Sequence, residues 1–64
     1  MNDRLMLRPA EVADAIGVSR SKVYELLANH TIPSVLVGSS VRVPVDELRA
    51  WIGRQVKAAS ESAV

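Results

Sequence analysis

The sequence predicts a small domain that is mainly α-helical and carries one small β-hairpin. Three observations predict this fold class. Residues 9–34 hold two short amphipathic segments of helical periodicity, separated by a turn at Gly17. Residues 34–43 place β-branched side chains on both sides of a Gly/Ser turn, which is typical of a β-hairpin. A third amphipathic segment follows Pro44, so the expected order is helix, turn, helix, hairpin, helix.

The first helix is predicted over Leu7–Ile16. Pro9 suits the first helical position, where its missing N–H would have no partner. Arg8 stands at the cap position, although its side chain cannot accept a hydrogen bond from the free amides. We expect Glu11 to compensate in part by bonding back to the Arg8 amide. The buried stripe repeats at helical spacing and consists of Val12, Ala13 and Ile16.

The second helix is predicted over Arg20–Asn29. Gly17 ends the preceding helix in a left-handed conformation, and Ser19 caps the new one. The apolar stripe of this helix is Val23, Leu26 and Leu27. Its opposite side holds Ser21, Tyr24, Glu25 and Ala28, with Arg20 and Lys22 flanking in the first turn. Two cations in a first turn oppose the helix dipole, which a fold tolerates more readily when a phosphate lies there.

The hairpin is predicted from residues 34–37 and 41–43, with its turn at Gly38, Ser39 and Ser40. We expect Val35, Val37 and Val43 to face the core, and Leu36 and Arg42 to face outward. A hairpin that follows two such helices forms a wing, so the predicted architecture is a winged helix-turn-helix.

The third helix is predicted to open at Pro44, with Asp46 and Glu47 in a first turn where the dipole favours acids. Its expected buried side is Val45, Leu48, Trp51, Ile52 and Val56. We expect one domain over residues 7–57, with a short leader at 1–6 and a flexible, frayed tail at 58–64.

Composition narrows the function classes. The 64 residues include no cysteine and a single histidine, His30, so we expect neither a metal site nor a cofactor. The sequence holds no nucleophile–His–carboxylate set and no phosphate-binding loop, which argues against an enzyme. No apolar run approaches the ~20 residues that span a bilayer, and the N-terminus does not read as a signal peptide. We therefore expect a cytoplasmic protein without membrane contact.

Charge gives weak support for a nucleic-acid partner, because eight basic and seven acidic residues leave a net charge of only +1. The distribution of charge along the chain is more informative, because residues 20–42 hold three cations and one anion. The polar side of the second helix is therefore the candidate surface for double-stranded DNA. The candidate DNA-binding residues are Ser19, Arg20, Ser21, Lys22, Tyr24 and Glu25 in the second helix and its cap, and Ser39, Ser40 and Arg42 in the wing.

Several of these assignments leave alternatives open. Arg20 and Lys22 could be ordinary solvated charges. Tyr24 could be a packing residue, or its hydroxyl could bond a phosphate and its ring touch a thymine methyl. Glu25 could pair with Arg20 or Ser21, or accept from a cytosine amino group. His30 is expected to be a loop residue with no catalytic task.

The chain resembles the excisionase-type helix-turn-helix family, which is related to the DNA-binding part of MerR-type regulators. The resemblance covers about fifty residues and rests on Leu7–Ala13, Ile16–Ser19, Lys22–Tyr24, Ile32–Pro33, Val35, Gly38, Arg42–Pro44 and Glu47–Trp51. Arg8 departs from the usual Thr cap, and Asn29-His30 stands where the family commonly has a glycine. Leu36, Ser39 and Ser40 occupy wing positions that are often basic, which predicts a shallow salt dependence for the wing.

This resemblance implies a recombination directionality factor, bacterial or phage-encoded and nucleoid-associated, that assists a site-specific integrase in excision. A module this small should bury roughly 600–1,000 Å² on DNA, so we expect several copies to bind tandem sites and to bend the duplex. One alternative is a transcriptional regulator that uses the same module, although MerR-type regulators add a coiled-coil helix and an effector domain for which this chain is too short. Another is a phage packaging module or a protein-binding adaptor that uses the apolar side of the third helix.

Overall fold

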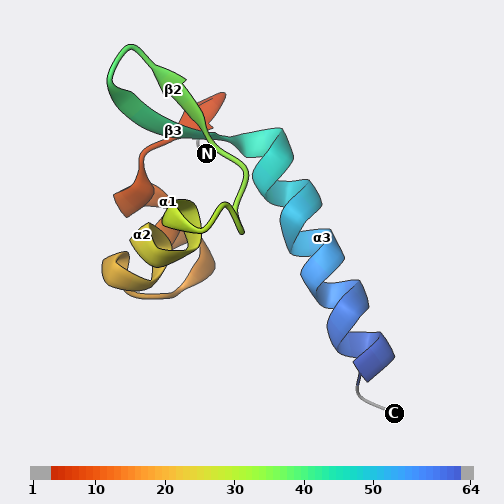
Figure 1. Cartoon of the computed structure of the whole chain (residues 1–64). Helices are drawn as coiled ribbons and strands as arrows, with labels where there is room; N and C mark the ends of the chain where they lie inside the picture. Colours follow the sequence, from red (N-terminus) through yellow and green to blue (C-terminus); the bar gives the residue numbers. More distant parts are fainter. Residues whose placement is uncertain (1–3, 63–64) are drawn as a thin grey trace.

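The structure is a computed structural model that describes residues 4–62, and it confirms a mainly helical fold with a small antiparallel sheet (Figure 1). Two short helices pack together, a three-stranded sheet lies beside them, and a long third helix leaves the sheet and runs away from the other two (Figure 1). In chain order the elements are β1 (Met6–Leu7), α1 (Pro9–Ile16), α2 (Arg20–Ala28), β2 (Val35–Val37), β3 (Ser40–Pro44) and α3 (Val45–Ser62).

A single apolar core joins these elements. Most of its members are small aliphatic side chains, as the composition allows, and nearly all are less than 5% exposed. The core consists of Leu7, Val12, Ala13, Val23, Ile32, Val43 and Leu48. Every element except β2 contributes at least one of these residues. The wing therefore projects beyond the core, and only β3 anchors it there.

The sheet has one strand that the sequence did not predict. Leu7 was expected in the first helix, but it belongs to β1, where it pairs with Val43 of β3. The Val45 amide continues this contact by donating to the Leu5 carbonyl at 2.9 Å. Because Leu7 and Val43 are both buried, β1 fixes the base of the wing to the helical core. α1 accordingly begins at Pro9 rather than at Leu7.

The predicted faces of the wing are wrong for β2. Val35 pairs with Arg42 and Leu36 pairs with Val41, so each pair lies on one face of the sheet. Since Val43 is buried, the core face is that of Val41 and Leu36, and Val35 lies on the opposite face. Val35 and Val37 are 43% and 52% exposed, and neither reaches the core.

The predicted buried side of α3 is correct only in its first half. Leu48 is buried and Trp51 is half-buried, but Ile52 is 38% exposed and Val56 is 62% exposed. The reason is that α3 runs away from the other two helices toward its end, so that nothing in residues 4–62 covers Val56 fully (Figure 1).

The ends of α3 also differ from the expectation. Pro44 closes β3 instead of opening the helix, which begins at Val45. Residues 58–62, expected to be frayed, continue α3 as regular helix to Ser62. The remaining parts of the expected leader and tail, residues 1–3 and 63–64, lie outside the described residues.

Candidate nucleic-acid interface

The turn between α1 and α2 fixes how the candidate helix is presented. Gly17 adopts a left-handed backbone, with φ of 74°, and its amide donates to the Ala13 carbonyl at 2.9 Å. Only glycine takes this conformation without strain, so Gly17 ends α1 as predicted. Beyond the turn, Val23 of α2 and Val12 of α1 are both fully buried members of the same apolar core. The burial of Val23 turns the apolar side of α2 inward and leaves the opposite side outward.

The start of α2 is built as the sequence indicated. The Ser19 hydroxyl accepts a hydrogen bond from the Lys22 amide at 3.1 Å, which satisfies one of the free N–H groups of the first turn. α1 begins differently, because the Arg8 amide donates to Glu11 Oε1 at 2.9 Å while the Arg8 side chain offers no acceptor. Glu11 also forms an ion pair with Arg4. The expected compensation by Glu11 is thus confirmed.

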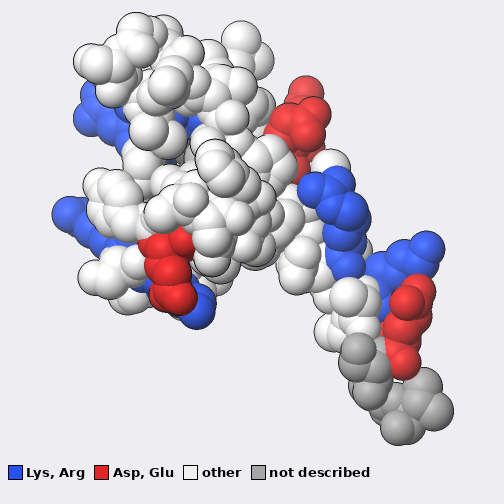
Figure 2. Space-filling model, in the orientation of Figure 1, with Lys and Arg blue, Asp and Glu red and all other residues white. Residues whose placement is uncertain are grey.

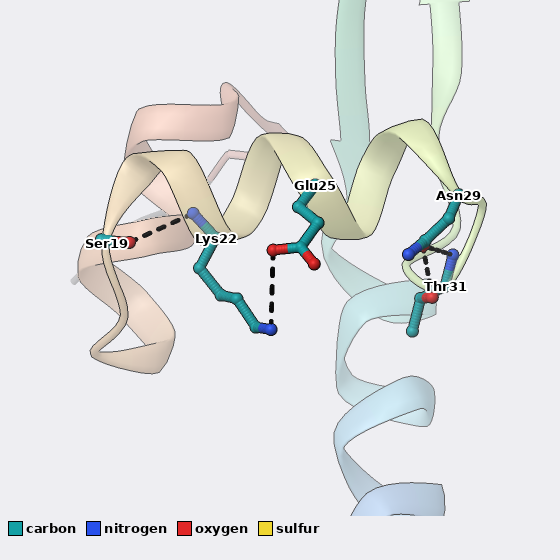
Figure 3. A network of polar contacts seen from close by, with 5 residues as sticks. All are labelled: Ser19, Lys22, Glu25, Asn29 and Thr31. Carbon is teal, nitrogen blue, oxygen red and sulfur yellow. Dashed lines mark hydrogen bonds and ion pairs between the residues drawn. The ribbon is translucent and has the colours of Figure 1, made fainter.

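The outer side of α2 gathers the predicted contact residues. Arg20, Ser21, Lys22, Tyr24 and Glu25 are all exposed, and Tyr24 is 58% exposed. Figure 3 shows Lys22 and Glu25 on the same side of the helix. The Lys22 Nζ lies 3.6 Å from Glu25 Oε2, so Glu25 pairs with Lys22 rather than with Arg20 or Ser21. Both side chains are more than half exposed, and such a pair contributes little to stability. A phosphate can therefore displace Glu25 from Lys22 at small cost.

The tip of the wing is a narrow turn without charged side chains. Gly38 has φ of 64° and Ser39 follows it in a two-residue turn between the paired Val37 and Ser40. Ser39 is not among the described residues with positive φ, so the left-handed residue stands at the first central position, as in a type II′ turn. Ser39 and Ser40 are exposed, as a contact with DNA would need.

Arg42 is the one basic residue of the wing strands, and its side chain is half-buried instead of projecting into solvent. Its Nη1 donates to the Val41 carbonyl at 2.8 Å. It shares a sheet face with Val35, which is the face opposite the core. The guanidinium retains further N–H donors, but it lies on the opposite face of the sheet from Leu36 and Val41.

The turn that follows α2 contains an unusual backbone conformation at His30, where the sequence resemblance leads one to expect a glycine. His30 adopts a left-handed conformation with φ of 60°, and it is the non-glycine residue with positive φ within residues 4–62. The side chain of Asn29 stabilises this turn, because its Oδ1 accepts from the Thr31 amide at 3.2 Å and from the Thr31 hydroxyl (Figure 3). A glycine would take this backbone without strain, whereas His30 carries a Cβ in it.

Sequence reasoning missed a groove of about 380 Å³ between α2 and the wing. Tyr24 and Leu27 line it from α2, and Leu36 and Val41 line it from the wing. A two-residue turn at Gly38 and Ser39 could have indicated it, because that turn pairs Leu36 with Val41 on the sheet face of Val43.

The charges are dispersed over the molecule. Figure 2 shows Lys and Arg side chains at separate places around the helical part and along α3, where acidic side chains lie among them. Within the part of the chain that the structure describes, no group of three or more His, Asp or Glu side chains could hold a metal ion. That part also has no helix with the length and apolar character needed to cross a bilayer.

Comparison with known families decides the classification of this arrangement. The family model described as "Helix-turn-helix domain" matches residues 6–56, which is most of the chain and spans β1 through the first two thirds of α3. The chain belongs to the helix-turn-helix domain family. It is accordingly a small DNA-binding protein, and α2 is the second helix of its helix-turn-helix. Neither the curated proteins nor the solved structures gave a significant match.

Proposed function

We propose that this helix-turn-helix protein recognises double-stranded DNA by placing α2 in the major groove, and that it acts as an excisionase. The observation that carries the proposal is the exposed outer side of α2, where the burial of Val23 on the inner side leaves Arg20, Lys22 and Tyr24 exposed to solvent. The major groove of B-DNA is wide enough to admit an α-helix, and each base pair presents a distinct pattern there.

Each side chain of α2 has a role that follows from its chemistry. Arg20 and Lys22 neutralise phosphates or reach a base edge, and within residues 4–62 Arg20 makes no ion pair that would compete. Tyr24 offers a hydroxyl to a phosphate and a ring to a thymine methyl. Glu25 repels phosphate, so its role is discrimination through a cytosine amino group rather than affinity. Ser21 is small enough to allow close approach.

The cap and the wing complete the proposed surface. The Ser19 hydroxyl already accepts a hydrogen bond from the Lys22 amide, so Ser19 contributes to DNA binding by orienting α2. Ser39 and Ser40 approach the neighbouring backbone, since a small turn can come close to a strand. Arg42 supplies the charge at that side, through the donors that the Val41 carbonyl leaves unused.

The small size of the module favours cooperative binding. A single unit buries roughly 600–1,000 Å² on DNA, which supports only weak specific affinity. Several copies on tandem sites would add their contacts and offset part of the energy of bending the duplex. This behaviour suits an architectural factor that directs an integrase toward excision. The test is a footprint on DNA that includes an attachment site: protection of repeated sites beside it supports an excisionase, and protection confined to a promoter supports a transcriptional regulator.

A protein-binding role is a second candidate, because one observation favours it. Ile52 and Val56 expose an apolar stripe on α3, beside a groove of about 400 Å³ that Ile16, Val18 and Trp51 also line. Substitution of Lys22 or Tyr24 by alanine separates the two functions. Loss of the mobility shift with the fold retained supports DNA recognition by α2, an unchanged shift removes α2 from the DNA surface, and no shift with the unsubstituted protein supports an adaptor.

A further inference from the structure

The two edges of the sheet differ in how they are protected. The strand order is β1-β3-β2, so β1 and β2 are the edge strands. β1 is only two residues long and is followed at once by Arg8 and Pro9, and a short strand, a cation and a proline all discourage a further strand from pairing. β2 is also short, but residues 34–41 include no Asp, Glu, Lys, Arg or Pro. β2 is therefore the open edge of the sheet.

The side chains of β2 are apolar and exposed on both faces of the sheet. Leu36 is 70% exposed and lies on the face of Val41, whereas Val35 and Val37 are exposed on the opposite face. A strand with one solvated face usually alternates apolar and polar residues, and a continuous apolar run is typical of a strand that is covered on both faces. The composition of β2 thus fits a strand with a further neighbour better than it fits a solvated edge.

The backbone of β2 directs one donor and one acceptor to the open edge at Leu36. Val37 and Ser40 flank the two-residue turn, and in such a hairpin the pair next to the turn is hydrogen-bonded. Hydrogen-bonded and non-hydrogen-bonded pairs alternate along an antiparallel ladder, so the next pair, Leu36 and Val41, is not hydrogen-bonded. The N–H and C=O of Leu36 consequently point away from β3, to a side where residues 4–62 supply no further strand.

We propose that β2 of one copy pairs antiparallel with β2 of a second copy, with Leu36 opposite Leu36 on a two-fold axis. The two Leu36 residues then exchange both backbone hydrogen bonds, and Val35 of each copy lies opposite Val37 of the other. Cross-strand pairs of apolar and β-branched side chains stabilise a sheet. No charged side chain within residues 31–41 opposes the approach of the two copies.

A second copy fits this edge because β2 is complementary to itself. The antiparallel register about Leu36 matches every donor with an acceptor and every apolar side chain with another, on both faces of the sheet. The pairing uses the same edge of both copies, so it closes at two and leaves no open β2 edge. It involves no residue of α2, so the surface proposed for DNA stays available on both copies.

The test is sedimentation equilibrium of the full chain without DNA, so it succeeds or fails independently of the placement of α2. Such a short strand pairing buries less than the ~1,200 Å² of a standard interface, so the concentration series runs from about 10 μM to about 1 mM. We expect the mass to rise from 6.9 kDa toward twice that value. We also expect hydrogen exchange of the Leu36 amide to slow as the concentration rises, because the second copy accepts from it.

Two substitutions at Leu36 act on different parts of the pairing. Leu36→Lys places two ammonium groups opposite each other, and Leu36→Pro removes the outward N–H, which an edge strand tolerates. We expect both variants to keep the monomer mass throughout the series. The matched control is Leu5→Lys, which makes the same change at a leucine that is 84% exposed and precedes β1, the other edge strand. We expect this control to associate as the unsubstituted protein does.

Three results would overturn the proposal. The first is an unsubstituted protein that keeps the monomer mass at about 1 mM. The second is association of Leu36→Lys to the same extent as Leu5→Lys, which would show that the copies meet elsewhere. If Val56→Lys then abolished that association, the exposed apolar stripe of α3 would be the contact. The third is a mass that rises beyond twice the monomer value, because the pairing of β2 with β2 closes at two copies.

Discussion

The Ser19 hydroxyl accepts a hydrogen bond from the Lys22 amide at 3.1 Å, and the Lys22 side chain in turn lies 3.6 Å from Glu25 (Figure 3). One contact fixes where α2 begins, and the other places a cation and an anion on its exposed side. The helix start and the proposed DNA surface are therefore coupled through one residue. Removal of the cap is expected to loosen the position of both cations in the first turn.

Ser19→Ala should lower the free energy of unfolding by about 1 kcal/mol, because the free amides of α2 lose their side-chain acceptor. Ser21→Ala is the matched control, since Ser21 is exposed, lies in the same turn and caps nothing. Urea denaturation followed by circular dichroism measures both. Equal midpoints for the two variants would show that the cap contributes no stability.

His30→Gly should raise the free energy of unfolding by about 0.5–1 kcal/mol. His30 has φ of 60°, a left-handed conformation that costs a residue with a Cβ about 1–2 kcal/mol. Glycine removes that cost but adds entropy to the unfolded chain, so the net gain is smaller. His30→Ala keeps the Cβ and should leave stability roughly unchanged. If the glycine variant is no more stable than the alanine variant, the backbone at residue 30 is not strained.

Lys22→Ala should weaken DNA binding and make the salt dependence shallower. Each phosphate neutralised contributes about 0.9 to the slope of log K against log salt, so the slope should fall by about that amount. Lys57→Ala removes the same charge from exposed α3, outside the proposed surface, and is the control. The slopes come from anisotropy titrations at several salt concentrations, and identical slopes for the two variants would remove Lys22 from the interface.

Val12→Ala and Val56→Ala separate the real core from the stripe that the sequence predicted. Val12 is fully buried, so its truncation should cost about 2 kcal/mol through lost burial and the cavity left behind. Val56 is 62% exposed on a helix, and its replacement by a better helix former should change stability by less than about 0.5 kcal/mol. Thermal unfolding of both variants checks this. A large loss for Val56→Ala would mean that the second half of α3 is covered.

The helices and their turn could be predicted because local chemistry decides them. Gly17 takes the left-handed backbone, Ser19 caps α2, and Val23 faces inward. Each of these follows from residues within one or two helical turns. The exposure of the candidate residues on α2 followed as well, because helical periodicity fixes the opposite side once the buried side is known.

The contacts between distant segments were decided only by the tertiary structure. The pairing of Leu7 with Val43 made a strand of residues that read locally as the start of a helix. The register of β2 against β3, with only Gly38 and Ser39 in the turn, placed Leu36 rather than Val35 on the sheet face of Val43, because a strand shifted by one residue turns every side chain to the other face. Leu36 is nevertheless 70% exposed, as an outward-facing residue was expected to be. The periodicity of α3 shows which side is apolar but not how far the rest of the domain reaches along it, and that reach left Val56 exposed.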